Sequence, residues 1–89
     1  MTTQEESPLT FPCTYPVKAM GRSGIALERT VLEIVAQHAP GVSADDVRLS
    51  ESSRGSYISV TITFTAESRG QLEAIYRDLQ AHESILATL

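Results

Sequence analysis

The sequence predicts one α+β domain whose elements follow one another in the order β-α-β-β-α-β. Two segments carry apolar residues at helical spacing, and the segments around them alternate between apolar and polar residues as strands do. With 89 residues, of which 42% are apolar, the chain suffices for a single core and is too short for two. We expect a disordered lead-in over residues 1–10, which are polar and aperiodic, and a single domain over residues 11–89.

The first strand and helix are predicted from the segment that precedes residue 41. Residues 11–20 alternate, but Pro12 and Pro16 weaken the first half, so the strand is expected over Tyr15–Met20. The stretch Gly21-Arg22-Ser23-Gly24 is typical of a turn. An amphipathic helix of about four turns is predicted next, because one face carries side chains at helical spacing: Leu27, Val31, Ile34, Val35 and His38. Ala39-Pro40-Gly41 should end it.

The remaining elements are a hairpin, a second helix and a terminal strand. A short polar strand from Val47 runs into Ser52-Ser53-Arg54-Gly55, where glycine would supply the positive φ of a tight hairpin. The clearest alternation in the chain follows, over residues 58–65. Ser68 and Gln71 form a capping-box pattern ahead of a helix that has one apolar side, made by Leu72, Ile75, Tyr76 and Leu79. Residues 85–89 predict the last strand.

This order fits a ferredoxin-like fold: a four-stranded antiparallel sheet with two helices packed on one face. Right-handed crossovers place the first and third strands in the middle. The other face should be polar and open to solvent, since it would carry Lys18, Arg48, Ser59, Thr61 and Thr63. Function is expected on this open face or at an end of the sheet.

Charge and cysteine content argue against several classes of protein. A net charge of −4 and a pI near 5.0 disfavour nucleic acid as a partner. Of the outward positions on which RNA-binding domains of this fold class display aromatic residues, only Tyr57 is aromatic. The acidic N-terminus and the lack of a long apolar run disfavour export and membrane insertion. The single cysteine, Cys13, favours a reducing compartment, which we expect to be the cytoplasm.

One end of the open face is the predicted ligand-binding site. There the end of the first strand should lie beside the start of the third, forming a positive, hydroxyl-rich patch on an acidic protein. The candidate residues are Lys18, Met20, Gly21, Arg22, Ser23, Gly24, Ser53, Arg54, Gly55, Tyr57 and Ser59. A structural interpretation stays open, in which the glycines shape turns, Tyr57 covers sheet backbone and the charges are solvated.

No catalytic or metal-binding pattern is found. Cys13, His38 and His82 lack the spacing of a nucleophile with its base or of a zinc site. Asp45 and Asp46 precede a strand and indicate a turn or cap. No phosphate-binding loop, nucleophile elbow or dinucleotide fingerprint occurs. We expect neither enzymatic activity nor a cofactor.

Three stretches resemble the YbeD-like family of small bacterial proteins: residues 11–21, residues 52–60 and the helix-strand ending at Leu89. The resemblance implies a ferredoxin-type fold similar to the ACT domains, which sense amino acids and similar small ligands. The family's function is unassigned, and a link to lipoate metabolism is inferred for it only from gene neighbourhood. Where ACT domains commonly carry Asp or Asn and a proline before the glycine, this chain has Gly21-Arg22-Ser23-Gly24, which favours an anion over an ammonium group.

The sequence leaves two functions open. One is an ACT-like regulatory domain that senses a small anionic metabolite. The other is a protein-protein interaction adaptor that acts through a sheet edge or the open face. A homodimer formed by edge strands is also left open.

Overall fold

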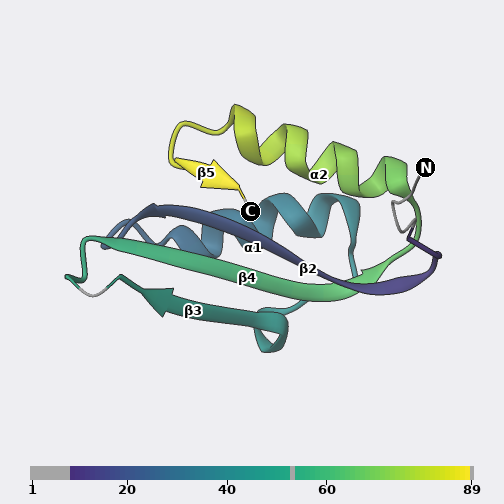
Figure 1. The fold of residues 1–89 in the computed structure, drawn as a ribbon, viewed down its shortest axis with the longest axis horizontal. Coiled ribbons are helices and arrows are strands. Elements are labelled where there is room, and N and C mark those ends of the chain that lie inside the picture. Colours follow the sequence, from purple (N-terminus) through teal and green to yellow (C-terminus); the bar gives the residue numbers. More distant parts are fainter. Residues whose placement is uncertain (1–8, 53, 89) are drawn as a thin grey trace, which may run out of the picture.

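The computed structural model describes residues 9–52 and 54–88. The elements are, in order, β2 (Cys13–Arg22), α1 (Leu27–His38), the 3-10 helix η1 (Ala44–Asp46), β3 (Val47–Glu51), β4 (Tyr57–Ala66), α2 (Arg69–Ala81) and β5 (Ala87–Thr88). The sheet is antiparallel with the order β3-β4-β2-β5, and β2 and β4 form its centre (Figure 1). The predicted ferredoxin-like βαββαβ fold is confirmed. The predicted lead-in falls mainly on residues 1–8, which lie outside the described residues; Leu9 and Thr10 are exposed.

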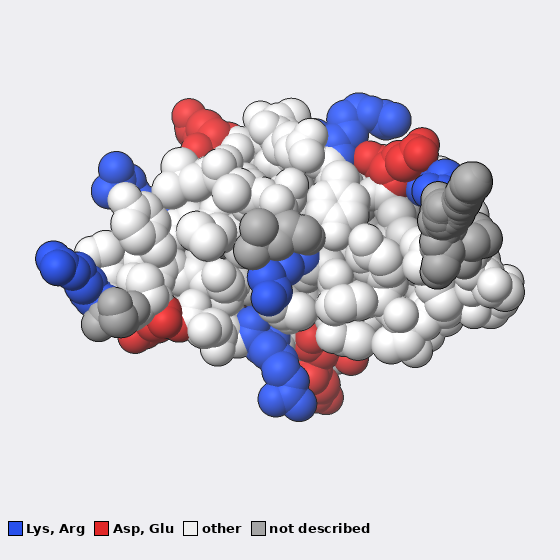
Figure 2. All heavy atoms as spheres, viewed as in Figure 1, with Lys and Arg blue, Asp and Glu red and all other residues white. Residues whose placement is uncertain are grey.

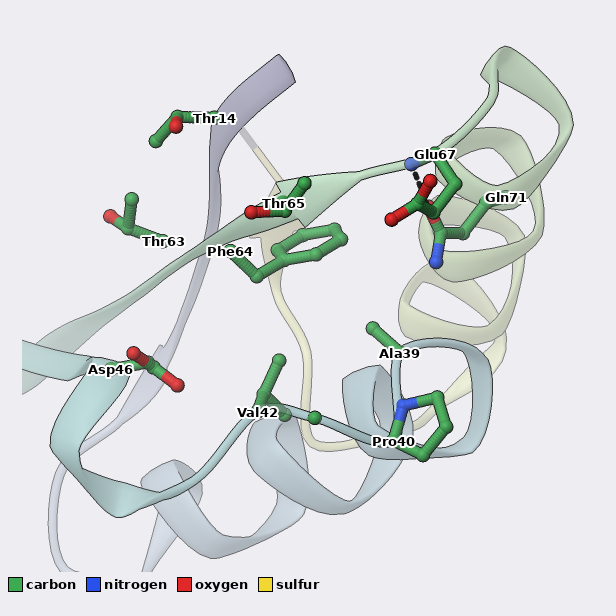
Figure 3. Close-up of a pocket in the computed structure, with 11 residues that line it drawn as sticks. Thr14, Ala39, Pro40, Val42, Asp46, Thr63, Phe64, Thr65, Glu67 and Gln71 are labelled. Carbon is green, nitrogen blue, oxygen red and sulfur yellow. Dashed lines mark hydrogen bonds between the residues drawn. The ribbon is translucent and has the colours of Figure 1, made fainter. Parts of the chain in front are cut away.

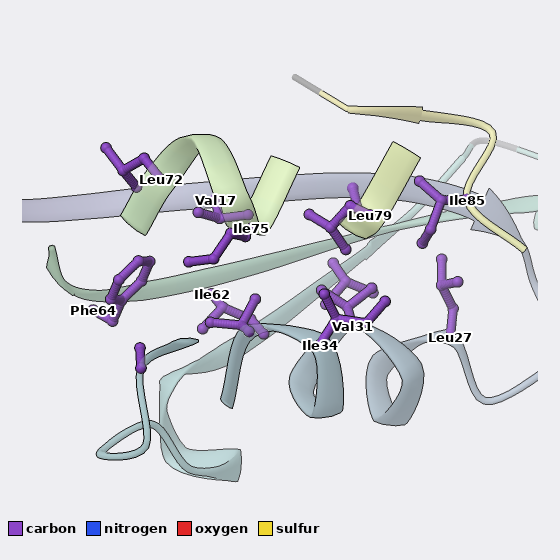
Figure 4. Close-up of a cluster of buried hydrophobic side chains, with 14 of the residues drawn as sticks. Val17, Leu27, Val31, Ile34, Ile62, Phe64, Leu72, Ile75, Leu79 and Ile85 are labelled. Atoms are coloured by element: carbon purple, nitrogen blue, oxygen red, sulfur yellow. The ribbon is translucent and has the colours of Figure 1, made fainter. Parts of the chain in front are cut away.

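The hydrophobic core lies between the two helices and the inner face of the sheet (Figure 4). Alternate residues of β4 are buried there: Ile58, Val60, Ile62, Phe64 and Ala66. The helices contribute their apolar sides, which are Leu27, Val31, Ile34 and Val35 of α1 and Leu72, Ile75 and Leu79 of α2. Fully burying a leucine or isoleucine side chain stabilises the fold by about 1.5–3 kcal/mol. A slip of one residue in β4 would turn its apolar residues to the open face, so the alternation specifies the register.

The first strand is longer than the predicted Tyr15–Met20, and the assignment of Gly21 and Arg22 to a turn was wrong. β2 begins at Cys13 and continues through both residues, with Gly21 paired to Ile58. A Cβ on Gly21 would lie 2.6 Å from the main-chain oxygen of Ser84 and 2.8 Å from Cδ2 of Leu27. Glycine is therefore required here because two other segments approach the strand closely, and not because the chain turns.

Pro16 lies inside β2 without breaking the sheet. The main-chain oxygen of Met20 accepts a hydrogen bond of 2.8 Å from the N–H of Leu86, so alternate residues of β2 direct their main-chain groups towards β5. Pro16 belongs to that set, but among residues 9–52 and 54–88 the partners of β5 are Ala19 and Met20. The N–H that proline lacks thus lies on a stretch of strand edge that β5 does not reach, where proline is tolerated.

Two further elements are shorter than predicted. α1 has 12 residues, about three turns, and ends before Ala39 as the following proline indicates. The last strand is limited to Ala87–Thr88, whereas residues 85–89 were predicted; Leu89 lies outside the described residues. Ile85 turns its side chain into the core and its N–H donates to the carbonyl of His82 at 3.1 Å, so it belongs to a turn.

Candidate functional site

The open face of the sheet presents the alternate residues that β2, β3 and β4 turn away from the helices. The register places Arg22 opposite Tyr57 and Met20 opposite Ser59. Ser59 is in turn opposite Ser50 of β3. The predicted juxtaposition of the end of the first strand with the start of the third is therefore present.

The structure brings most of the candidate residues to this end of the sheet, but not to one face. Gly21 is buried on the core side. Lys18 lies opposite Thr61, one step along the open face from Ser59. Arg22, Arg54 and Tyr57 are exposed, with Tyr57 40% exposed, and Lys18, Met20 and Ser59 are half-buried. Ser53 lies outside the described residues.

The turn after β2 is fastened to the β3–β4 hairpin. The Ser23 hydroxyl donates to the carbonyl of Gly55 at 2.5 Å, and the Ser23 N–H donates to the carbonyl of Ser56 at 3.1 Å. Gly24 and Gly55 both have positive φ, 88° and 71°, as tight turns demand of glycine. Both hydrogen-bond donors of Ser23 thus link the turn to the hairpin.

Sequence reasoning left Arg48 out of the candidate site, although it expected this residue on the open face. Thr61 lies opposite Lys18 on β2 and opposite Arg48 on β3, so the three residues form one row across the sheet. The described strand positions on this face carry three cations and no carboxylate: Thr14, Pro16, Lys18, Met20, Arg22, Arg48, Ser50, Tyr57, Ser59, Thr61, Thr63, Thr65 and Ala87. Figure 2 shows Lys and Arg side chains along the middle, at the left and at the upper right of the molecule, with acidic groups towards its rim, including beside the lower cation of the middle. Only the hairpin register, which the sequence leaves undetermined, reveals this row.

His38, Asp45 and Asp46 make structural contacts. Nε2 of His38 lies 2.6 Å from Oδ2 of Asp78, so this pair connects α1 to α2 on the helical side. Asp46 accepts from the N–H of Ser43 at 3.0 Å and Ser43 Oγ accepts from the N–H of Asp45 at 3.3 Å, which confirms the predicted cap. Within residues 9–52 and 54–88, no group of three His, Cys, Asp or Glu side chains could hold a metal ion. No helix of these residues is long and apolar enough to cross a membrane.

Two cavities, each of about 470 Å³, lie away from the candidate patch. One adjoins the last residues of β4, and the other runs along α2 beside Tyr15 and Tyr76. Burial, and then the neighbouring hydroxyl of Tyr15, raise the pKa of Tyr76 well above its ordinary value. None of the described candidate residues lines either of these two cavities.

The comparisons with known proteins agree with this fold. Residues 6–89 match the family model described as "Protein of unknown function (DUF493)". A UPF0250 protein of Neisseria gonorrhoeae is 41% identical over 91 residues, and one of Chromobacterium violaceum is 38% identical over 89 residues; each match covers 100% of both chains. The solution structure of protein HP0495 from H. pylori superposes with a TM-score of 0.77 at 12% identity, covering 100% of this chain and 94% of the other. The fold, the length and the matched residues together place this chain in the DUF493/UPF0250, YbeD-like family of small bacterial proteins of unknown function.

Proposed function

We propose that the protein is a non-catalytic adaptor whose open sheet face binds an acidic segment of a partner protein. One observation carries the proposal: an acidic chain gathers Lys18, Arg22 and Arg48 on one face, with no carboxylate at the described strand positions there. Complementary charge across an interface steers association and selects partners.

The shape of the face favours a protein segment over a small metabolite. The three cations come from two strands that flank β4, and rows of hydroxyl side chains lie between them. Small ligands usually bind in concave, largely apolar sites. A surface of spread cations and hydroxyl groups instead suits an extended chain with several carboxylates, because each can meet a separate donor.

An NMR titration tests the proposal. Capped hexaglutamate, added to ¹⁵N-labelled protein, should shift the amides of Lys18, Arg48 and Thr61 saturably, and capped hexalysine should not. Binding should weaken with added salt, because the Debye length is about 10 Å at 0.1 M and exposed charges are then screened. The proposal fails if hexaglutamate shifts no amide of the open face, or if hexalysine shifts the same amides equally.

The fastened turn favours a second candidate, an ACT-like sensor of a small anionic metabolite. Ser23 holds the β2–α1 turn against the hairpin, so Arg22 and Arg54 project from one rigid end of the sheet. This function predicts that succinate or inorganic phosphate shifts the amide resonances of Arg22, Gly24 and Gly55. The amide resonance of Arg48 should not shift. It also predicts a rise in melting temperature with either anion, because a ligand that binds only the folded state stabilises it. No shift and no rise with either anion would exclude those two as ligands.

A further inference from the structure

A cavity at the opposite end of β4 from Tyr57 carries a separate inference. It lies between the α1–β3 connection, residues 39–46, and the last residues of β4, and has a volume of about 470 Å³ (Figure 3). Cavities of about 300–1,000 Å³ accommodate small ligands. The open-face cations Lys18, Arg22 and Arg48 do not line it, although Thr14, Thr63 and Thr65 at the far end of that face do.

An edge of β4 forms one wall of the cavity. The register of β3 with β4 ends at the pair Val47 and Ile62, and β4 continues beyond it through Thr63 and Thr65. The carbonyl of Tyr57 accepts from the N–H of Ser52 at 2.9 Å, which shows that the odd-numbered residues of β4 direct their main-chain groups to the β3 side. The N–H and C=O groups of Thr63 and Thr65 therefore face the cavity side of the strand.

The floor of the cavity is apolar. In Figure 3 the ring of Phe64 lies between the side chains of Ala39 and Val42 below it and Thr65 beside it, and Pro40 borders the same space. Phe64 is 8% exposed, so only part of its ring is open to a ligand. An aliphatic chain laid against these groups would lose contact with water, which stabilises binding by about 25 cal/mol per Å² buried.

The charged groups at the cavity are carboxylates. Asp46 and Glu67 lie on opposite sides of Phe64 in Figure 3, and no Lys, Arg or His is among the described lining residues. The side chain of Gln71 is already engaged: its Nε2 donates to the carbonyl of His38 at 2.8 Å, and its Oε1 accepts from the N–H of Glu67 at 2.7 Å. The carboxylate of Asp46 uses one oxygen to accept from Ser43. A bound group with a positive charge and hydrogen-bond donors therefore complements the charged groups of this cavity.

We propose that this cavity binds a primary alkylammonium group, which is the chemistry shared by a free aliphatic amine and a lysine side chain. An ammonium has three donors and no acceptor, which matches two carboxylates and the carbonyls of a strand edge. The alkyl chain lies on Phe64 and Val42, and the charged end lies at Asp46 or Glu67.

The first test is a titration of ¹⁵N-labelled full-length protein with n-butylammonium chloride. Butyrate, which has the opposite charge, and potassium chloride at matched ionic strength are the controls. The proposal expects saturable shifts at the amides of Val42, Thr65 and Gln71 with butylammonium alone. Equal shifts with butyrate, or shifts with butylammonium that follow those of potassium chloride, would overturn it. An acetylated and amidated Ala-Lys-Ala peptide distinguishes the two sources, since tighter binding than butylammonium assigns the site to a lysine side chain and equal or weaker binding assigns it to a free amine.

Charge-neutral variants test the named residues. Asp46→Asn keeps a side-chain oxygen that can accept from the N–H of Ser43. Glu67→Gln does not alter the main-chain N–H of residue 67, which donates to Oε1 of Gln71. At least one of the two should weaken butylammonium binding about three- to fivefold, the effect of losing one partly exposed ion pair of up to about 1 kcal/mol. Glu33→Gln, an exposed position of α1 outside the cavity, is the matched control and should leave the affinity unchanged. Unchanged affinity in both cavity variants, with melting temperatures equal to that of the parent protein, would overturn the proposal.

Discussion

Arg48 and Lys18 both lie opposite Thr61, one from each neighbouring strand, so two cations share a single row across the open face. Strands in a sheet are about 4.8 Å apart, so residues two strands apart on one row lie about 10 Å apart at their Cα atoms. Two cations at this spacing in water repel each other only weakly, and a carboxylate between them would be attracted by both. An extended acidic partner would contact this row, whereas a small anion held at the hairpin would not.

Gly21→Ala should destabilise the fold strongly. The added Cβ would meet the main-chain oxygen of Ser84 at 2.6 Å, and overpacking of this kind costs about 1–3 kcal/mol. Gly41→Ala is the matched control, because no atom lies within 4 Å of its added Cβ. Urea denaturation of both variants measures the difference. Equal stability of the two variants would contradict the close approach at Gly21.

Gln71→Ala should lower the free energy of unfolding by about 1–2 kcal/mol. The change removes two hydrogen bonds that join the start of α2 to the end of β4 and to the carbonyl of His38, and leaves that carbonyl without its donor. Gln37→Ala, at an exposed position of α1, should change stability by less than about 0.5 kcal/mol. Thermal unfolding followed by circular dichroism compares them. If Gln71→Ala lowers the free energy of unfolding no more than Gln37→Ala does, the two side-chain hydrogen bonds of Gln71 do not stabilise the fold.

Tyr76 should make the protein sensitive to alkali. Its pKa is raised in the folded state by burial, so the stability that the neutral hydroxyl contributes is complete below the unfolded pKa near 10.0 and is lost as the pH rises towards the folded value. Tyr76→Phe removes this dependence, so the stability difference between the parent protein and the variant should narrow above pH 10.0. Tyr57→Phe, on the exposed face, is the control. Denaturant unfolding at a series of pH values measures both differences, and a difference for Tyr76→Phe that stays constant or widens would contradict the buried setting of this hydroxyl.

The elements most visible in the sequence were those with long, regular patterns. The alternation of β4 predicted a strand, and the apolar side of α1 predicted a helix, together with the face that each turns to the core. Each pattern buries its apolar residues on one face only in a conformation with the matching period, about 2 residues for a strand and about 3.6 for a helix. Gly21 was misassigned because a glycine required by close packing and one required by a turn look alike in sequence. The last strand was overestimated because Ile85 fills the core from a turn, and an apolar residue alone does not reveal whether its backbone pairs.

The candidate site was predictable only in part. The pairing of β2 with β4 follows from the topology, and it placed Arg22 beside Tyr57 as expected. The row through Thr61 depends on the register of β3, which a hairpin loop of undetermined length leaves free in the sequence. The cavity with Asp46 and Glu67 joins segments about twenty residues apart, and no local pattern brings them together.

The most direct test of the adaptor proposal is a pair of variants, Arg48→Gln and Arg54→Gln, titrated with capped hexaglutamate at low salt. Both remove one positive charge from an exposed position, so the net charge is the same in the two proteins. Arg48→Gln should weaken binding about three- to fivefold, since Arg48 lies in the row with Thr61 and Lys18, and Arg54→Gln at the hairpin should have a smaller effect. A larger loss with Arg54→Gln, or no loss with Arg48→Gln, would contradict binding across the open face.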